Sequence, residues 1–224
     1  MIAFDNLWQT AVLHKGSEKA VKADLPKVST KKALCAQSDA YYLSEMSRRI
    51  FRAGLKHSVI DAKWPAFEAA LNQFNPLACA LMPDEKLDEL MANKALIRHL
   101  GKMKAIRVNA AMVLDIAKTH GSFGQFIAGW PEDDIVNLWT YLKKHGAQLG
   151  GMSGARFLRM VGKDTFLLTD DVVAVLKAHG AITKAPTSKK DLATVQAVFN
   201  DWHSESGLPY SHISRVVSMT AGLW

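Results

Sequence analysis

The sequence is poor in cysteine. Only Cys35 and Cys79 occur in 224 residues, and they form no CxxC pair. This excludes a zinc site built on several thiolates as well as a disulfide framework. The eight histidines show neither HxxxH nor HxH spacing, so neither a metal nor another cofactor is expected. Two reduced cysteines are typical of a cytosolic protein, and a cytoplasmic location is expected.

Long apolar runs and strand patterns are also missing. The N-terminal MIAFDNLWQTAVLHKG carries Asp5 early, and no stretch approaches membrane-spanning length. We therefore expect neither a signal peptide nor a contact with membranes. No window alternates convincingly between apolar and polar residues, and the strand-like FLL at 166–168 is short. The pattern predicts an all-α protein.

The composition that is present indicates a globular, basic protein. Hydrophobic residues make up 49% of the chain, enough for one or two compact domains, and the formal charge is +7. A basic protein suits a polyanionic partner such as nucleic acid. Charge alone also fits a helical protein-interaction domain that is only incidentally basic.

Helical periodicity and capping residues predict the elements. Ser38 and Asp39 begin a helix that stops at Gly54, and Pro65 opens a helix that ends before Asn75. An N-terminal helix and a lysine-rich linker containing Pro26 precede them. Further helices are expected at 84–92, 102–120, 133–145, 172–179, 189–204 and 211–219. We expect a divergent segment at 1–37 and a main domain of two helical lobes at 38–224.

The segment YLKKHGAQLGGMSGARFLRMVG at 141–162 predicts a helical hairpin that holds phosphate. Glycines permit close approach of a phosphate, free amides at the start of the second helix favour an anion, and flanking cations add charge-assisted contacts. Such a grip carries no sequence information. The alternative is an ordinary helical turn with glycine stops. The candidate DNA-binding residues are Lys143, Lys144, Gly150, Gly151, Met152, Ser153, Gly154, Arg156 and Arg159.

Asp170 and Asp171 follow the hairpin directly and open the next predicted helix. A carboxylate at a helix N-terminus is stabilised by the helix dipole, so either Thr169 or one of the two aspartates is expected to cap this helix. A carboxylate near a flipped nucleotide would also stabilise the cationic sugar that forms when a glycosidic bond breaks. Both aspartates are therefore candidate catalytic residues, Asp170 first.

An ordered set of segments resembles the DNA-3-methyladenine glycosylase I branch of the helix-hairpin-helix DNA glycosylases. The segments are AGLKHSVIDAKWPAFEAALNQFNP at 53–76, IRHLGKMKAIRVNA at 97–110, GSF at 121–123, YLKKHGAQLGG at 141–151 and LTDDVV at 168–173. This resemblance implies a two-lobed helical fold with a helix-hairpin-helix motif. It also implies an enzyme that flips a damaged, alkylated purine out of duplex DNA and hydrolyses its bond to deoxyribose. A monomer is expected.

Departures from the family pattern affect the metal and the substrate. No residues match the cysteines and histidines that clip the family's termini with zinc, so no metal is expected. The family's base-recognising glutamate is matched by Arg49, and its tryptophan after AGL by His57. Arginine would repel a cationic base. The resemblance implies a base pocket in the region of Tyr41, Tyr42, Arg49, His57 and Trp64.

Three functions remain open at this point. The first is a monofunctional glycosylase, because Ala155 or Arg156 stands where bifunctional members carry a lysine nucleophile. The second is a catalytically inactive DNA-binding module of the same fold. The third is the helical interaction domain mentioned above. The C-terminal NDWHSESGLPYSHISRVVSM also resembles the wider superfamily.

Overall fold

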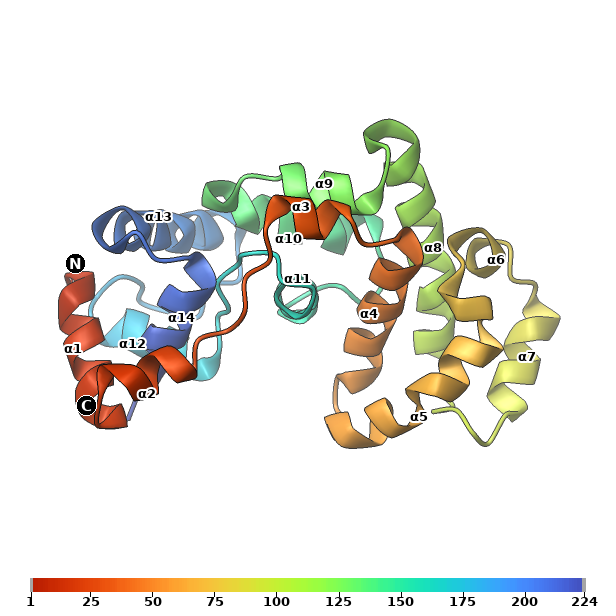
Figure 1. Cartoon of the computed structure of the whole chain (residues 1–224), viewed down its shortest axis with the longest axis horizontal. Coiled ribbons are helices and arrows are strands. Elements are labelled where there is room, and N and C mark those ends of the chain that lie inside the picture. Colours follow the sequence, from red (N-terminus) through yellow and green to blue (C-terminus); the bar gives the residue numbers. More distant parts are fainter. Residues whose placement is uncertain (1, 223–224) are drawn as a thin grey trace. The chain divides into compact units, whose positions relative to one another are not determined.

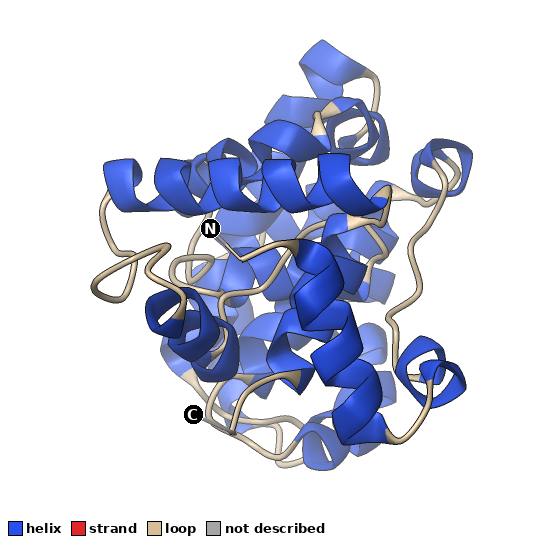
Figure 2. Ribbon diagram, turned by 90° about the vertical axis from the view of Figure 1, so that its left-hand side faces the viewer, coloured by secondary structure: helices blue, strands red, loops and turns tan. Residues whose placement is uncertain are grey.

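The computed structural model describes residues 2–222, which form two compact helical units. Among these residues, unit 1 comprises 2–28, 131–137 and 164–222, and unit 2 comprises 29–130 and 138–163. Figure 2 shows helices joined by loops, with no strand in the described part of the chain. The predicted all-α class is therefore confirmed. Within residues 2–222, no helix is both long and apolar enough to cross a membrane.

Unit 2 contains most of the sequence motifs. Its long helix α8 packs against α4, α6, α7 and α9 (Figure 1). Its core is aromatic, with the Trp64 ring stacked between Phe67, at 4.9 Å between centroids, and Phe74, at 5.3 Å. Its elements are α3 (Lys31–Cys35), α4 (Asp39–Arg52), α5 (His57–Ala70), η1 (Asn72–Phe74), α6 (Pro76–Ala80), α7 (Asp84–Ala92), α8 (Leu100–His120), α9 (Phe123–Gly129), most of α10 (Ile135–His145) and α11 (Ser153–Met160).

Polar caps and a glycine stop set the ends of several unit 2 helices. The Ser38 side chain accepts from the Tyr41 amide at the start of α4, as the sequence predicts. In the GSF motif, Gly121 ends α8 with a φ of 83° and Ser122 caps α9. Asp39 accepts from the Phe123 amide at 2.8 Å, which ties the start of α9 to the start of α4. The Ser38 and Ser122 caps and the Gly121 stop are short-range signals that separate these helices, whereas the Asp39 contact is long-range.

The expected start of α5 is wrong. Pro65 was expected in the first helical turn, but α5 begins at His57 and Pro65 lies inside it. An internal proline costs a helix about 3 kcal/mol. Ile60, Trp64 and Phe67 follow helical spacing and are all buried, and full burial of such side chains contributes about 1.5–3 kcal/mol each. Packing of this face therefore outweighs the proline.

Unit 1 brings the beginning and the end of the chain together. Helices α1 and α14 pack against each other, and α12 packs against α14 (Figure 1). Phe166 stacks on Phe199 with ring centroids 4.1 Å apart, and Trp202 donates its indole N–H to the Ile2 carbonyl oxygen. The elements are α1 (Phe4–Lys15), α2 (Glu18–Ala23), η2 (Glu132–Asp134), the start of α10, α12 (Asp170–Ala178), α13 (Lys189–Ser206) and α14 (Tyr210–Met219).

Candidate nucleic-acid interface

Helices α10 and α11 of unit 2 are joined by a turn at residues 146–152, in agreement with the hairpin expected from the sequence. Lys143 and Lys144 are exposed on the last turn of α10. Gly150, Gly151 and Met152 lie in the turn, Ser153 and Gly154 open α11, and Arg156 and Arg159 follow on α11, both partly buried. All nine candidate DNA-binding residues therefore belong to one structural feature.

The turn is held by Asn109, a fully buried residue of α8. Its Oδ1 accepts from the Ala147 amide at 2.7 Å, and its Nδ2 donates to the Ala147 carbonyl oxygen at 3.2 Å. Asn109 is not among the functional residues predicted from the sequence. A signal was available, because a polar amide stands among the apolar residues Met103, Ile106, Ala110 and Val113 of the same helix. A polar group in such a position needs a specific partner.

The glycines of the turn serve different purposes. A Cβ on Gly146 would lie 2.9 Å from both Asn109 Oδ1 and the Leu142 carbonyl oxygen, so this glycine permits the tight exit from α10. Gly154 also faces inward, because its Cβ would lie 3.0 Å from the Leu149 carbonyl oxygen. Gly151 alone combines a positive φ of 55° with open space around the Cβ position. Only Gly151 fits the expected role of letting a phosphate approach.

The start of α11 can accept an anion. The amides of Gly154 and Ala155 donate to no acceptor among the described residues, and the N-cap residue Met152 supplies no side-chain cap. Unpaired amides at a helix start carry partial positive charge. The exposed ammonium groups of Lys143 and Lys144 add to that charge. The arrangement has the chemistry of a phosphate site.

A second basic group of unit 2 consists of Arg49 and Arg52 on α4 and Arg156 on α11. The two helices pack side by side (Figure 1). Arg49 is partly buried, and its Nε is buried without a hydrogen-bond partner. Burial, and then the charges of Arg156 and Arg52, lower the pKa of Arg49 below its ordinary value. The residue at the position of the family's glutamate therefore lies in a positive environment.

The residues expected in a base pocket separate into two groups. Tyr42 is fully buried and donates its hydroxyl to the Leu34 carbonyl oxygen at 2.6 Å, and Trp64 is 1% exposed and donates to Ser44 Oγ at 2.9 Å. Both rings are structural, so they leave the set of candidate base contacts. Tyr41 is partly exposed and packs edge-on against Tyr42, while His57 is exposed at the start of α5.

Glu45 is a partly buried carboxylate that is not among the functional residues predicted from the sequence. Its side chain is 14% exposed, and its Oε1 lies 3.1 Å from Nη1 of Arg48. Burial is the main cause that raises the pKa of Glu45, against the opposing charges of Arg48 and Arg52. Arg48 in turn lies over the Trp64 ring at 5.1 Å. Sequence spacing alone cannot identify such a carboxylate, since Glu45 follows the same helical pattern as exposed residues.

Asp170 and Asp171 are exposed at the first two positions of α12 in unit 1. Of the expected caps, Thr169 is confirmed and the two aspartates are not. Thr169 is the N-cap, and its side chain accepts from the Val172 amide at 3.3 Å. Asp164, just before, accepts from the amides of Tyr210 and Ser211 and so holds the start of α14. Neither Asp170 nor Asp171 has a capping role that would explain it.

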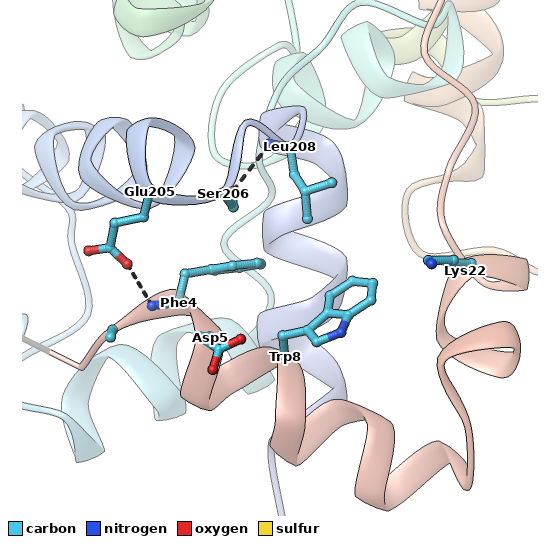
Figure 3. A pocket seen from close by; sticks show the side chains of 8 residues that line it. Phe4, Asp5, Trp8, Lys22, Glu205, Ser206 and Leu208 are labelled. Atoms are coloured by element: carbon cyan, nitrogen blue, oxygen red, sulfur yellow. Dashed lines mark hydrogen bonds between the residues drawn. The ribbon is translucent and has the colours of Figure 1, made fainter.

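Each unit has an open cavity of its own. The cavity of unit 1, about 380 Å³, is lined by Phe4 and Trp8 together with Asp5, Lys22 and Glu205 (Figure 3). Glu205 accepts from the Phe4 amide there. The cavity of unit 2, about 420 Å³, lies beside α8 and α10 and includes Arg107, Asp115, Tyr141 and His145. Within the described residues, no three acidic, histidine or cysteine side chains are placed to hold a metal ion.

Curated relatives resemble part of the chain. The DNA-3-methyladenine glycosylase of Haemophilus influenzae is 36% identical over 76 residues, which cover 34% of this chain and 41% of the relative. The DNA-3-methyladenine glycosylase 1 of Escherichia coli is 32% identical over 76 residues, with the same shares. The match therefore spans about two fifths of the length of these relatives.

Solved structures resemble larger parts of the chain. The 3-methyladenine DNA glycosylase I of Staphylococcus aureus, solved to explain 3-methyladenine recognition, matches with a TM-score of 0.51 and 27% identity. That match covers 56% of this chain and 77% of the other. The 8-oxoguanine glycosylase/lyase of Methanocaldococcus jannaschii, solved with DNA containing 8-oxoguanine, has a TM-score of 0.54 at 15% identity and covers 94% of each chain. That likeness shows the fold.

The family assignment rests on residues 34–153, which match the methyladenine glycosylase family. This range includes α4 with Arg49, the Asn109 clamp on Ala147, and the turn between α10 and α11. It covers more than half of the 224 residues. The chain belongs to the methyladenine glycosylase family.

Proposed function

We propose that the protein is a DNA N-glycosylase of base excision repair. It binds duplex DNA through the α10–α11 turn and hydrolyses the bond between a damaged, alkylated purine and deoxyribose. The observation that carries this proposal is the turn itself. Among the described residues, two unpaired amides at the start of α11, the open Gly151 in the turn and two exposed lysines at the end of α10 lie around the turn that Asn109 holds. Asn109 and the turn belong to the region matched to the family.

The proposed chemistry is hydrolysis without a covalent enzyme intermediate. Helix α11 has no lysine, and Ala155 is buried. The lysine that follows α11, Lys163, is 1% exposed and donates to the Trp130 carbonyl oxygen. An amine held in this way cannot attack a sugar carbon. We propose Asp170 as the carboxylate that stabilises the sugar cation, with Asp171 as the alternative, and neither a metal nor a cofactor takes part.

A catalytically inactive DNA-binding module is the second candidate. The observation that favours it is Arg49, which replaces the glutamate implied by the family resemblance and lies in a positive environment. Both candidates bind DNA as a monomer, and both require binding that weakens with salt. Only the enzyme releases a base.

Single-turnover release of purines from methylated duplex DNA separates the two candidates. We expect free methylated purine to accumulate with time, and alkali to cleave the strand at the resulting abasic sites. Binding to undamaged duplex is measured in parallel across a range of salt concentrations. Lys143→Gln and Lys144→Gln should each reduce the salt slope, because each removes one phosphate contact. Salt-dependent binding without base release identifies the inactive module, and the absence of binding rejects both.

A further inference from the structure

The basic group on α4 and α11 has more positive charge than the surrounding protein balances. Asp61 accepts two hydrogen bonds from Arg52 Nη2, at 2.6 and 2.7 Å, and another from Nε. Glu45 pairs with Arg48 at 3.1 Å. Asp61 and Glu45 are therefore already paired with Arg52 and Arg48. Arg49 and Arg156 have neither an ion pair nor a hydrogen bond to their guanidinium groups among the described residues.

The C-terminal end of α4 supplies no further negative charge. Its carbonyl groups would normally attract a cation. Lys102 of α8 already occupies them, because its Nζ donates to the carbonyl oxygens of Ala53 at 2.8 Å and Phe51 at 3.3 Å. Lys102 is itself buried. Burial, and to a smaller extent the charge of Arg49, lower the pKa of Lys102. Arg49 thus lies near Arg52, Arg156 and Lys102. Among the described residues, no carboxylate pairs with its guanidinium group.

We propose that Arg49 and Arg156 form an anion site that takes a phosphate group. Guanidinium groups donate in a fixed planar fork that matches phosphate oxygens, and two of them bind one phosphate from adjacent sides. Arg156 belongs to α11, the helix that begins at the proposed DNA-binding turn. A DNA strand gripped at that turn is the natural source of the phosphate, and this choice rests on the proposed function. Free phosphate is the other source.

Thermal unfolding with inorganic phosphate as the probe tests the site without DNA. In chloride, Arg49→Gln should leave the midpoint unchanged or raise it, because the substitution removes repulsion between cations. A structural arginine would give the opposite result. At matched ionic strength, phosphate should stabilise the wild type more than Arg49→Gln, since only the wild type gains from binding. Equal stabilisation of both proteins contradicts the site.

Arg107 of α8 provides a matched control. Its Nε is also buried without a hydrogen-bond partner, but its Nη2 forms an ion pair with Asp84 Oδ1 at 2.8 Å. Arg107→Gln should lower the midpoint slightly or not at all, and it should leave the phosphate effect intact. A loss of the phosphate effect in Arg107→Gln would show that general charge, rather than the Arg49 site, is responsible.

The salt dependence of binding to undamaged duplex identifies the source of the phosphate. If Arg49 and Arg156 hold one backbone phosphate, the double variant Arg49→Gln/Arg156→Gln should reduce the salt slope by about one. A phosphate effect on unfolding with an unchanged slope supports the anion site and overturns DNA as its source. If both effects are absent, the site is overturned altogether. Base release is measured in a separate experiment. A protein that releases no base can therefore still show the anion site, and the two failures are distinguishable.

Discussion

Asn109 hydrogen-bonds both backbone polar groups of Ala147, which lies 38 residues later in the sequence. The contact joins the middle of α8 to the turn between α10 and α11. Because Asn109 is fully buried, its amide has no water to replace these bonds. The geometry of the phosphate site proposed at the α10–α11 turn therefore depends on a buried side chain of another helix, Asn109.

Asn109→Ala should destabilise the protein and weaken DNA binding together. Each buried polar group left without a partner costs about 1–3 kcal/mol. Below the unfolding temperature, we expect faster hydrogen exchange at Ala147 and weaker binding to any duplex, damaged or not. Asn75→Ala is the control, because it removes the cap on Ala78 of α6, at a cost of about 1 kcal/mol, without touching the turn. Equal DNA affinity for Asn109→Ala and wild type would contradict the clamp.

The turn glycines should respond differently to substitution. Gly151→Val places a branched side chain at a positive φ, which costs about 1–3 kcal/mol, and extends it into the space offered to a phosphate. Affinity should fall alike for duplexes of different sequence, because phosphate contacts carry no sequence information. Gly154→Val should act mainly on folding, since its Cβ would meet the Leu149 carbonyl oxygen. Measured binding curves and unfolding midpoints separate the two effects. A change in sequence preference at unchanged affinity would contradict the proposed grip.

Local signals in the sequence predict most of the long helices and the turn, but contacts distant in sequence remain hidden. The apolar spacing of Ile106, Ala110 and Val113 and the stop at Gly121 are sufficient to predict most of α8. By contrast, the role of Asn109 depends on Ala147, and the start of α5 depends on how Trp64 packs. Spacing also fails to distinguish the buried ring of Tyr42 from the partly exposed ring of Tyr41, because neighbouring residues on one helix differ only in what covers them.

Glu45 should make stability depend on pH above its ordinary pKa of 4.5. Burial raises the pKa of this carboxyl in the folded protein, so the folded chain binds the proton more tightly than the unfolded chain. The contribution of Glu45 to the free energy of unfolding is therefore greatest below pH 4.5 and falls as pH rises above it. Urea unfolding of Glu45→Gln and wild type should show a difference that shifts in favour of the variant from pH 4.5 to 7.

Glu18 provides the control for this measurement. It is exposed, and its hydrogen bond and ion pair with Lys22 lower its pKa in the folded protein. Its small contribution is present above pH 4.5 and is lost as pH falls below that value, the opposite sign. Glu18→Gln should therefore track the wild type above pH 4.5. A difference between Glu45→Gln and wild type that stays constant with pH would contradict the prediction.

Asp170→Asn should separate chemistry from folding. Thr169 already caps α12, so the substitution removes a charge without removing the cap. We expect the unfolding midpoint and DNA affinity to stay close to those of the wild type. Single-turnover release of methylated purines should fall by about two orders of magnitude or more, the scale of losing a preorganised electrostatic contact.

Asp171→Asn and Thr169→Ala complete the test of the carboxylate. Thr169→Ala should cost about 1 kcal/mol of stability with base release retained, because it removes the cap and keeps both carboxylates. If Asp171→Asn, rather than Asp170→Asn, abolishes release, the alternative carboxylate carries the chemistry. Undiminished release in both aspartate variants would remove the carboxylate mechanism. The departing base would then need little help, because an alkylated purine that carries a positive charge is already a good leaving group.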